Sequence, residues 1–309
     1  MPALAFQASN GAIYCSSMKH PDWNPTHIQS LMVELGAYAL DRQDTLHTES
    51  KSDGSPVTDI DKELERRLRA ELVQEGHNWI GEETVEAEGA GAPELALEQT
   101  TWVVDPIDGT AAYAAGLPSW GISVALMHEG ELVEGALFVP STGEFITTAG
   151  EDVYASPQLI GTEPRRPHYS ASVSEDSQLE LFRPRAAGSP QSGMVSLAQG
   201  VTKRGRFLGE NPVQTISSCV YSIVNVLTGR YGGYICWLKL WDIAASLVLF
   251  DRLGHVVLTQ SGEHLGLRVE EPYYDLSQNS RRCWAVHEHL LITRDEATAR
   301  YLAEQVRYP

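Results

Sequence analysis

Two aspartates three positions apart, Asp105 and Asp108, follow an apolar run that begins at Trp102. Carboxylates held this close repel one another, and the pKa of each would rise unless a cation lay between them. Hard divalent cations such as Mg²⁺ prefer oxygen ligands. Gly109 lets the chain turn sharply, and Thr110 can begin a helix whose free N–H groups face an anion. The segment therefore indicates metal-assisted phosphate chemistry, with an Asp-Pro turn closed by a glycine as the structural alternative.

Three further stretches accompany this one: KSDGSPVTDID at 51–61, IGEET at 80–84 and WDIAA at 241–245. Together with DPIDGT at 105–110, they resemble in chain order the motifs of the inositol monophosphatase superfamily, the lithium-sensitive, Mg²⁺-dependent phosphomonoesterases. The resemblance departs from the family pattern after DGT, where the chain continues with two alanines, and before Trp241, where an acid that contacts substrate is missing. The catalytic motifs therefore match the family pattern, whereas the substrate pocket is expected to differ from it.

The resemblance implies a metal site built from four carboxylates and one backbone carbonyl. These ligands are Glu82, Asp105, Asp108, Asp242 and the carbonyl of Ile107. Together with a dianionic phosphate, the carboxylates carry a negative charge that two or three Mg²⁺ ions would largely neutralise, whereas a single ion would leave strong repulsion. Mn²⁺ is the expected substitute and Li⁺ the expected inhibitor.

Roles in catalysis also follow from the resemblance. Asp61 and Thr110 would orient a metal-activated water and take up its proton, with Glu83 supporting the metal ligands. The N–H groups of Gly109, Thr110 and Ala111 would hold the phosphoryl oxygens. Three more residues are candidates for substrate contacts: Lys51, Cys236 and Trp237. The alternatives are an exposed loop lysine for the first and buried core positions for the other two.

The resulting hypothesis is Mg²⁺-dependent hydrolysis of a small phosphorylated metabolite. Inositol phosphate, sugar phosphates and histidinol phosphate are candidate substrates, and 3′-phosphoadenosine 5′-phosphate is the alternative substrate class. Cys236 and Trp237, where an acid would be expected, tilt the choice away from inositol phosphate. A rival hypothesis is a non-catalytic interaction protein on the same fold.

The composition limits which partners and which cellular compartment we expect for this protein. The 309 residues carry a formal net charge of −18, which argues against nucleic acid or an acidic membrane as a partner. Four widely spaced cysteines fit neither a zinc pattern nor a disulfide framework. With no signal-like N-terminus and no long apolar span, we expect a cytoplasmic enzyme. The resemblance also implies that the protein forms a homodimer.

The resemblance implies an αβαβα layered sandwich of the sugar-phosphatase type. We expect an N-terminal extension over 1–25, an α+β domain with an antiparallel sheet over 26–160, and an α/β domain with a mixed sheet over 161–309. The sequence pattern itself predicts helices over 26–40, 62–74, 219–227 and 242–253, and an antiparallel meander over 121–148. A stretch rich in alanine, glycine and acids over 86–98 predicts an exposed loop.

Two other groups of residues attract notice. His287 and His289 lie two positions apart with no third ligand nearby in the sequence, which favours a surface element over a metal site. A basic stretch could reach over a phosphorylated substrate, although a solvated segment is the preferred interpretation. It comprises Arg165, Arg166, Arg183, Arg185, Lys203, Arg204 and Arg206.

Overall fold

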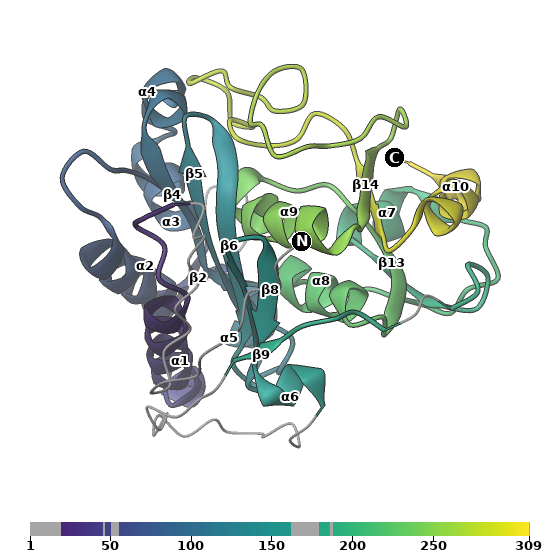
Figure 1. Cartoon of the computed structure of the whole chain (residues 1–309), viewed down its shortest axis with the longest axis horizontal. Helices are drawn as coiled ribbons and strands as arrows, with labels where there is room; N and C mark the ends of the chain where they lie inside the picture. The colour runs from purple at the N-terminus through teal and green to yellow at the C-terminus, as the bar shows by residue number, and fades with distance from the viewer. Residues whose placement is uncertain (1–19, 46, 51–55, 162–178, 186–187, 309) are drawn as a thin grey trace, which may run out of the picture.

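The computed structural model describes residues 20–45, 47–50, 56–161, 179–185 and 188–308. Five layers follow one another across the molecule, from helices α1 and α2 on one side to α7 and α10 on the other (Figure 1). A seven-stranded sheet and a five-stranded sheet alternate with these helices, and helices α8 and α9 lie between the two sheets. This arrangement is the expected αβαβα sandwich, so the predicted fold class is confirmed.

The larger sheet has the strand order β3-β4-β5-β6-β7-β8-β9. Its strands are β3 (Asn78–Gly81), β4 (Thr100–Asp108), β5 (Gly121–His128), β6 (Glu131–Val139), β7 (Glu144–Ala149), β8 (Asp152–Ala155) and β9 (Glu180–Leu181). The meander β5-β6-β7 is antiparallel, as predicted from its turns. Strands β3 and β4 pair in parallel, which places their carboxyl ends at the same edge.

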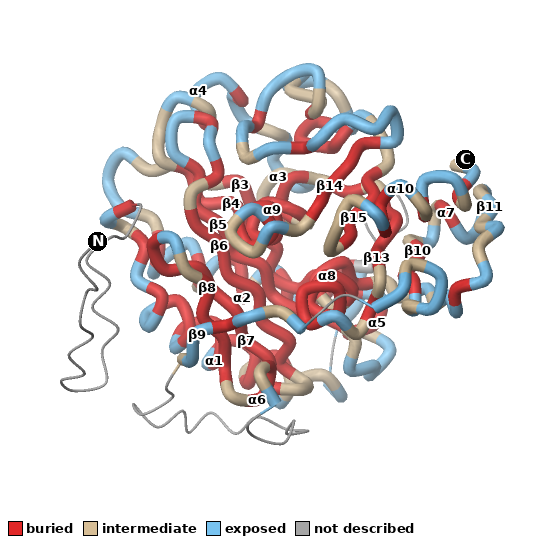
Figure 2. Tube along the Cα trace, turned by 45° about the vertical axis from the view of Figure 1, so that its right-hand side comes forward, coloured by how far each residue is buried: buried red, intermediate tan, exposed pale blue. Residues whose placement is uncertain are grey.

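Two helices form the central layer: α8 (Cys219–Leu227) and α9 (Leu240–Leu253). Ten of the fourteen residues of α9 are buried, which is the property of a helix covered on every side. Small residues permit its close approach to the larger sheet, because a Cβ on Gly135 of β6 would lie 2.4 Å from the carbonyl oxygen of Ala245. The buried core accordingly runs through this layer (Figure 2).

The smaller sheet has the order β12-β10-β13-β15-β14 and mixes parallel and antiparallel pairs. Its strands are β10 (Met194–Leu197), β12 (Val213–Gln214), β13 (Tyr231–Cys236), β14 (Val256–Thr259) and β15 (Leu290–Thr293). Helices α7 (Gln199–Arg204) and α10 (Glu296–Gln305) cover its outer face. A short pair, β11 (Arg206–Phe207) and β16 (Val306–Arg307), joins the ends of these two helices.

The outer helices of the larger sheet are α1 (Pro25–Leu40) and α2 (Asp59–Leu72). Asn24 caps α1, because its side chain accepts hydrogen bonds from the first-turn N–H groups of Thr26 and His27. Thr58 caps α2 in a capping box with Asp61, so this helix begins three residues earlier than predicted. Of the predicted N-terminal extension, residues 1–19 lie outside the described part, whereas Trp23 is fully buried.

The region 86–98 is largely exposed, as predicted, but it is mostly helical and not a loop. Helices α3 (Glu82–Glu88) and α4 (Pro93–Glu98) occupy most of it, joined by a short turn. Pro93 starts α4, and Pro93 and Ala96 are buried against the neighbouring strands. Tertiary burial of a few apolar positions therefore overrides the polar composition. Short elements complete the fold: the 3₁₀ turn Gln43–Thr45, β1 (Thr48–Ser50), β2 (Pro56–Thr58), α5 (Thr110–Ala114) and α6 (Pro157–Ile160).

Strand β9 pairs with β8 although it follows the predicted domain joint near residue 160. The larger sheet thus includes residues from both sides of that position. None of the helices in the described ranges has the length and apolarity needed to cross a membrane.

Candidate metal centre and catalytic site

The strand ends of the larger sheet bring two of the predicted metal ligands together. Gly81 of β3 pairs with Val104 of β4, so Glu82 leaves its strand beside the buried Asp105. Because parallel strands end at the same edge, a separation of 23 positions along the chain is closed by sheet pairing alone.

Strand β5 connects Asp105 to the start of helix α9. Asp105 lies opposite Ser123, whose hydroxyl donates a 3.1 Å hydrogen bond to the carbonyl oxygen of Trp241. Asp242 follows directly, in the first turn of α9. The backbone N–H of Lys239, three residues earlier at the N-cap, donates a 2.8 Å hydrogen bond to Asp242 Oδ2, which fixes the carboxylate at the helix start.

Asp108 accepts four hydrogen bonds from the beginning of helix α8. Oδ2 accepts from the Ser218 hydroxyl and from the Val220 N–H at 2.7 Å, and Oδ1 accepts from the Cys219 N–H at 3.1 Å and its thiol at 2.9 Å. A carboxylate is favoured at a helix N-terminus, and this one also links the two halves of the chain. Burial raises the pKa of Asp108, and these hydrogen bonds oppose the rise.

Ligand atoms of Asp108, Cys219 and Asp242 all lie within 4.8 Å of one another. In the absence of a cation, burial and then the charges of Asp108 and Glu82 raise the pKa of Asp242 to about 8. Burial and the neighbouring carboxylates, including Asp105, also raise the pKa of the Cys219 thiol. The charges of Glu82 and Asp105 therefore act on the group formed by Asp108, Cys219 and Asp242.

The cluster has the chemistry of a divalent-cation site. Carboxylate oxygens dominate it, and such hard donors suit Mg²⁺ or Mn²⁺. A cation would replace carboxylate repulsion with attraction, which removes the cause of the raised pKa of Asp242. The residues that would hold it are Glu82, Asp105, Asp108, Asp242 and the carbonyl of Ile107. The thiol of Cys219 adds one softer donor at the edge of the set.

Asp61 and Thr110 form the pair to which the sequence assigns acid–base work. Both side chains are buried, and the Thr110 hydroxyl lies 2.9 Å from Asp61 Oδ1 and 3.1 Å from the Ile107 carbonyl oxygen. The other oxygen, Oδ2, accepts hydrogen bonds from the N–H and hydroxyl of Thr58. The pair is therefore held rigidly beside the proposed carbonyl ligand.

Gly109 makes the turn between these groups. Its φ of +90° is a left-handed value, and an added Cβ would lie 2.8 Å from the Cβ of Ser218. Helix α5 begins at Thr110 as predicted, and Ala111 is exposed in its first turn. Backbone conformation and close packing both require glycine at position 109.

A carboxylate not predicted from the sequence holds the backbone of Glu83 and Thr84. Glu65 is buried and accepts hydrogen bonds from the N–H groups of Glu83 at 2.8 Å and Thr84 at 3.0 Å. Its position four residues after Asp61 on α2 puts both acids on one helix face, a signal that was available in the sequence. Ser218 and Cys219 were also missed, and nothing in their spacing from Asp108 indicates the contact.

The residues predicted to contact substrate have different surroundings in the structure. Lys51 lies outside the described residues. Cys236 is fully buried, with its sulfur 4.0 Å from the Leu290 carbonyl oxygen, so it occupies the core. Trp237 is half-buried and lines a surface pocket. Lys239, which had not been singled out, pairs with Glu86 at 3.1 Å across the two halves of the chain.

The layered fold and the carboxylate cluster define the class of metal-dependent phosphoric monoester hydrolases. The sequence model of the inositol monophosphatase family matches residues 28–304, so the chain belongs to this family. Most of the chain thus carries the resemblance first seen in four short motifs.

Individual relatives are distant. An inositol-1-monophosphatase of Rhizobium meliloti is 27% identical over 216 residues, covering 68% of this chain and 74% of the relative. A putative Nus factor SuhB of Neisseria meningitidis is 26% identical over 235 residues, covering 71% and 79%. The structure of an inositol monophosphatase of Thermotoga maritima superimposes with a TM-score of 0.63 at 19% identity, covering 90% and 96%.

Proposed function

We propose that this chain hydrolyses a small phosphate monoester with Mg²⁺ as its cofactor. The observation that carries the proposal is the convergence of Glu82, Asp105, Asp108 and Asp242 from three separate elements, α3, β4 and α9. The buried pair of Asp61 and Thr110 lies beside this cluster. With divalent cations bound, such a site could neutralise a phosphate and present a proton acceptor to water.

The residues of the chain have distinct tasks in this mechanism. Asp61 accepts the hydrogen bond of Thr110, which leaves the lone pairs of the hydroxyl free to orient the attacking water. Asp61 then takes up the proton of that water through the same contact. When bound, the divalent cations lower the pKa of water and stabilise charge on the phosphoryl and leaving oxygens. Backbone N–H groups at Gly109, Thr110 and Ala111 hold the phosphoryl group in line.

The substrate class is proposed more narrowly from the family and from the altered pocket. The name of the Rhizobium relative supports inositol phosphate, and sugar phosphates and histidinol phosphate share the same leaving chemistry. Cys236 lies in the core and contributes no acid to bind a polyol, which favours a substrate other than inositol phosphate. We further propose that the site binds two or three ions, that Mn²⁺ can replace Mg²⁺ and that Li⁺ inhibits. The protein is proposed to be a cytoplasmic homodimer. The division between its two domains is proposed near residue 160.

A hydrolysis screen tests this function. Phosphate release should be measured on phosphorylated polyols, sugars, histidinol and nucleotides, with Mg²⁺ and with EDTA. Asp242→Asn should abolish release, whereas Asp251→Asn, which removes an exposed acid from the same helix α9, should not change it. Absence of release from every monoester by folded, Mg²⁺-loaded protein would overturn the proposal.

A second candidate is an interaction protein built on the same fold. It is motivated by the relatives named Nus factor SuhB. Retention of the carboxylate cluster favours catalysis, and the net charge of −18 disfavours direct binding to nucleic acid. A complex recovered equally well with the wild type and with Asp242→Asn, together with no phosphatase activity, would favour this alternative.

A further inference from the structure

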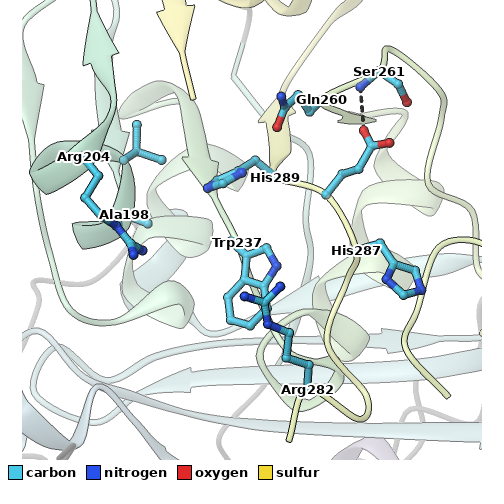
Figure 3. A pocket seen from close by; sticks show the side chains of 11 residues that line it. Ala198, Arg204, Trp237, Gln260, Ser261, Arg282, His287 and His289 are labelled. Carbon is cyan, nitrogen blue, oxygen red and sulfur yellow. Dashed lines mark hydrogen bonds between the residues drawn. The ribbon is translucent and has the colours of Figure 1, made fainter. Parts of the chain in front are cut away.

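A pocket of about 1000 Å³ opens in the second half of the chain, between α7 and the segment that leads into β15. Figure 3 shows Arg204 on the α7 side and Arg282 lying against the indole of Trp237. None of the proposed metal ligands lines it. His287, His289 and Arg204, which the sequence favoured as separate surface residues, thus share one cavity.

The pocket is cationic in an acidic protein. Among the described residues that line it, Glu288 is the one acid, and its carboxylate accepts a 2.7 Å hydrogen bond from the Ser261 N–H. Neither Arg204 nor Arg282 forms an ion pair with a described residue, although acids outnumber lysine and arginine by 41 to 23 in the chain. Two guanidinium groups that form no ion pair with an acid in the described ranges are suited to an oxyanion.

The wall of the pocket also offers a flat surface. The guanidinium carbon of Arg282 lies 5.7 Å from the centroid of the Trp237 ring, a loose cation–π contact. His289 lies on the other side of the indole in Figure 3, and burial followed by the nearby charge of Arg204 lowers its pKa. A neutral His289 can donate or accept a hydrogen bond without repelling the arginines.

The wall of the pocket and the metal centre share one short segment of the chain. Trp237 precedes Asp242 by five residues, so their Cα atoms lie at most about 18 Å apart. The intervening Lys239 donates to Asp242, so the wall of the pocket and a metal ligand belong to one continuous segment. The upper limit on this separation is compatible with one metabolite that spans the pocket and the metal centre.

We infer that Arg204, Arg282 and Trp237 form a subsite for a second oxyanion of the substrate, carried at the end remote from the scissile phosphate. This inference rests on the proposed function. It narrows the substrate to a small molecule with two anionic groups, in which the remote group is a carboxylate or a phosphate. The metal centre takes one end, and the arginines take the other.

Three substrates with the same carbon chain test the inference: glucitol 6-phosphate, 6-phosphogluconate and glucitol 1,6-bisphosphate. The wild type should show kcat/KM at least about tenfold higher for at least one charged-tail substrate, a difference of about 1.4 kcal/mol. The preferred member identifies the remote group as carboxylate or phosphate. In the double variant Arg204→Gln/Arg282→Gln, KM for the charged-tail substrate should rise until this advantage is lost. The kcat/KM for glucitol 6-phosphate should not change.

The matched control is the double variant Arg206→Gln/Arg281→Gln. It removes the same charge from exposed residues next to the pocket arginines that do not line the pocket. Equal kcat/KM for all three substrates in the wild type, or equal losses in both double variants, would overturn the inference while leaving the phosphatase function intact.

Binding of the same three ligands should also be measured by calorimetry, independently of turnover. Tighter binding of a charged-tail ligand that is lost in Arg204→Gln/Arg282→Gln supports the subsite even if no ligand is hydrolysed. In that case the subsite stands, and the hydrolysis screen decides the proposed function separately. Equal binding of all three ligands by the wild type refutes the subsite.

Discussion

The hydroxyl of Thr110 lies 2.9 Å from Oδ1 of Asp61, a residue 49 positions earlier in the chain. Helix α2 supplies the acid and the first turn of α5 supplies the hydroxyl. Both side chains are buried, so the contact is protected from bulk water and each partner limits the movement of the other.

Substitutions at position 110 should separate the hydroxyl from the size of the side chain. Thr110→Val should lower kcat by about 10²–10⁴-fold, because it keeps the volume but removes the group that orients water. Thr110→Ser retains the hydroxyl and should keep most of the activity. Steady-state kinetics with Mg²⁺ measures both, and similar losses in the two variants would contradict the assigned role.

Metal binding should become tighter as the pH rises. The pKa of Asp242 is about 8 without a cation, so below that pH the cation must displace a proton. The apparent affinity for Mg²⁺ should increase by up to about tenfold per pH unit between pH 6.5 and 8 and then level off. Calorimetry in buffers of different ionisation enthalpy measures the released proton. Affinity that does not change over this range would be inconsistent with the raised pKa.

Without metal, the same carboxyl group should make stability depend on pH. Its folded pKa lies above the ordinary value of 3.8, so the protonated acid favours the folded state. This stabilisation is present below about pH 4 and is lost as the pH rises through about 8. In EDTA, Tm should fall across this range, and the fall should be smaller in Asp242→Asn. Asp251→Asn should behave like the wild type, since this acid is exposed.

Gly109→Ala should be more damaging than the same change at another left-handed glycine. Gly109 has φ +90°, and an added Cβ would lie 2.8 Å from Ser218 Cβ, whereas Gly76 has φ +86° with no atom within 4 Å. Gly76→Ala should cost about 1–2 kcal/mol of unfolding free energy with normal activity. Gly109→Ala should cost more and should also abolish catalysis. Chemical denaturation and phosphate release should be measured for both variants. Equal losses of stability in Gly109→Ala and Gly76→Ala would show that close packing against Ser218 adds no cost.

The buried ion pair of Arg252 and Glu134 should be costly to break. Arg252 Nη1 lies 2.9 Å from Glu134 Oε2, with side-chain exposures of 2% and 0%, and it joins α9 to β6. Glu134→Gln should lower the unfolding free energy by about 3–5 kcal/mol, because it leaves a buried charge uncompensated. Glu270→Gln, at the exposed pair with Arg268, should cost about 1 kcal/mol or less. Urea titration measures both, and comparable values would show that burial does not decide the cost.

Local patterns in the sequence predicted much of the fold. Helix α8 begins and ends where its apolar run does, and the turns of the meander follow its glycines. The exposure of region 86–98 follows from its composition, but its helices were not predicted, because their few buried positions acquire partners only through tertiary contact. Composition alone cannot indicate such partners.

The candidate site could be predicted only where motifs exist. Spacing in the sequence does not reveal that Asp108 meets the start of α8, because that contact spans more than a hundred residues. The pocket is a similar case. Arg204, Trp237 and Arg282 come from three segments, and each alone resembles an ordinary surface or core residue. Only the folding of those segments onto one sheet assembles them.

The sharing of helices α8 and α9 by both sheets has a consequence for evolution and engineering. Because α9 presents apolar side chains to both sheets, removal of either sheet would expose apolar side chains of this helix to water. The halves should therefore melt in a single calorimetric transition, and isolated fragments should aggregate. Transplanting a new specificity onto this scaffold should then succeed by exchanging rim segments such as 280–289, with the shared central helices left untouched.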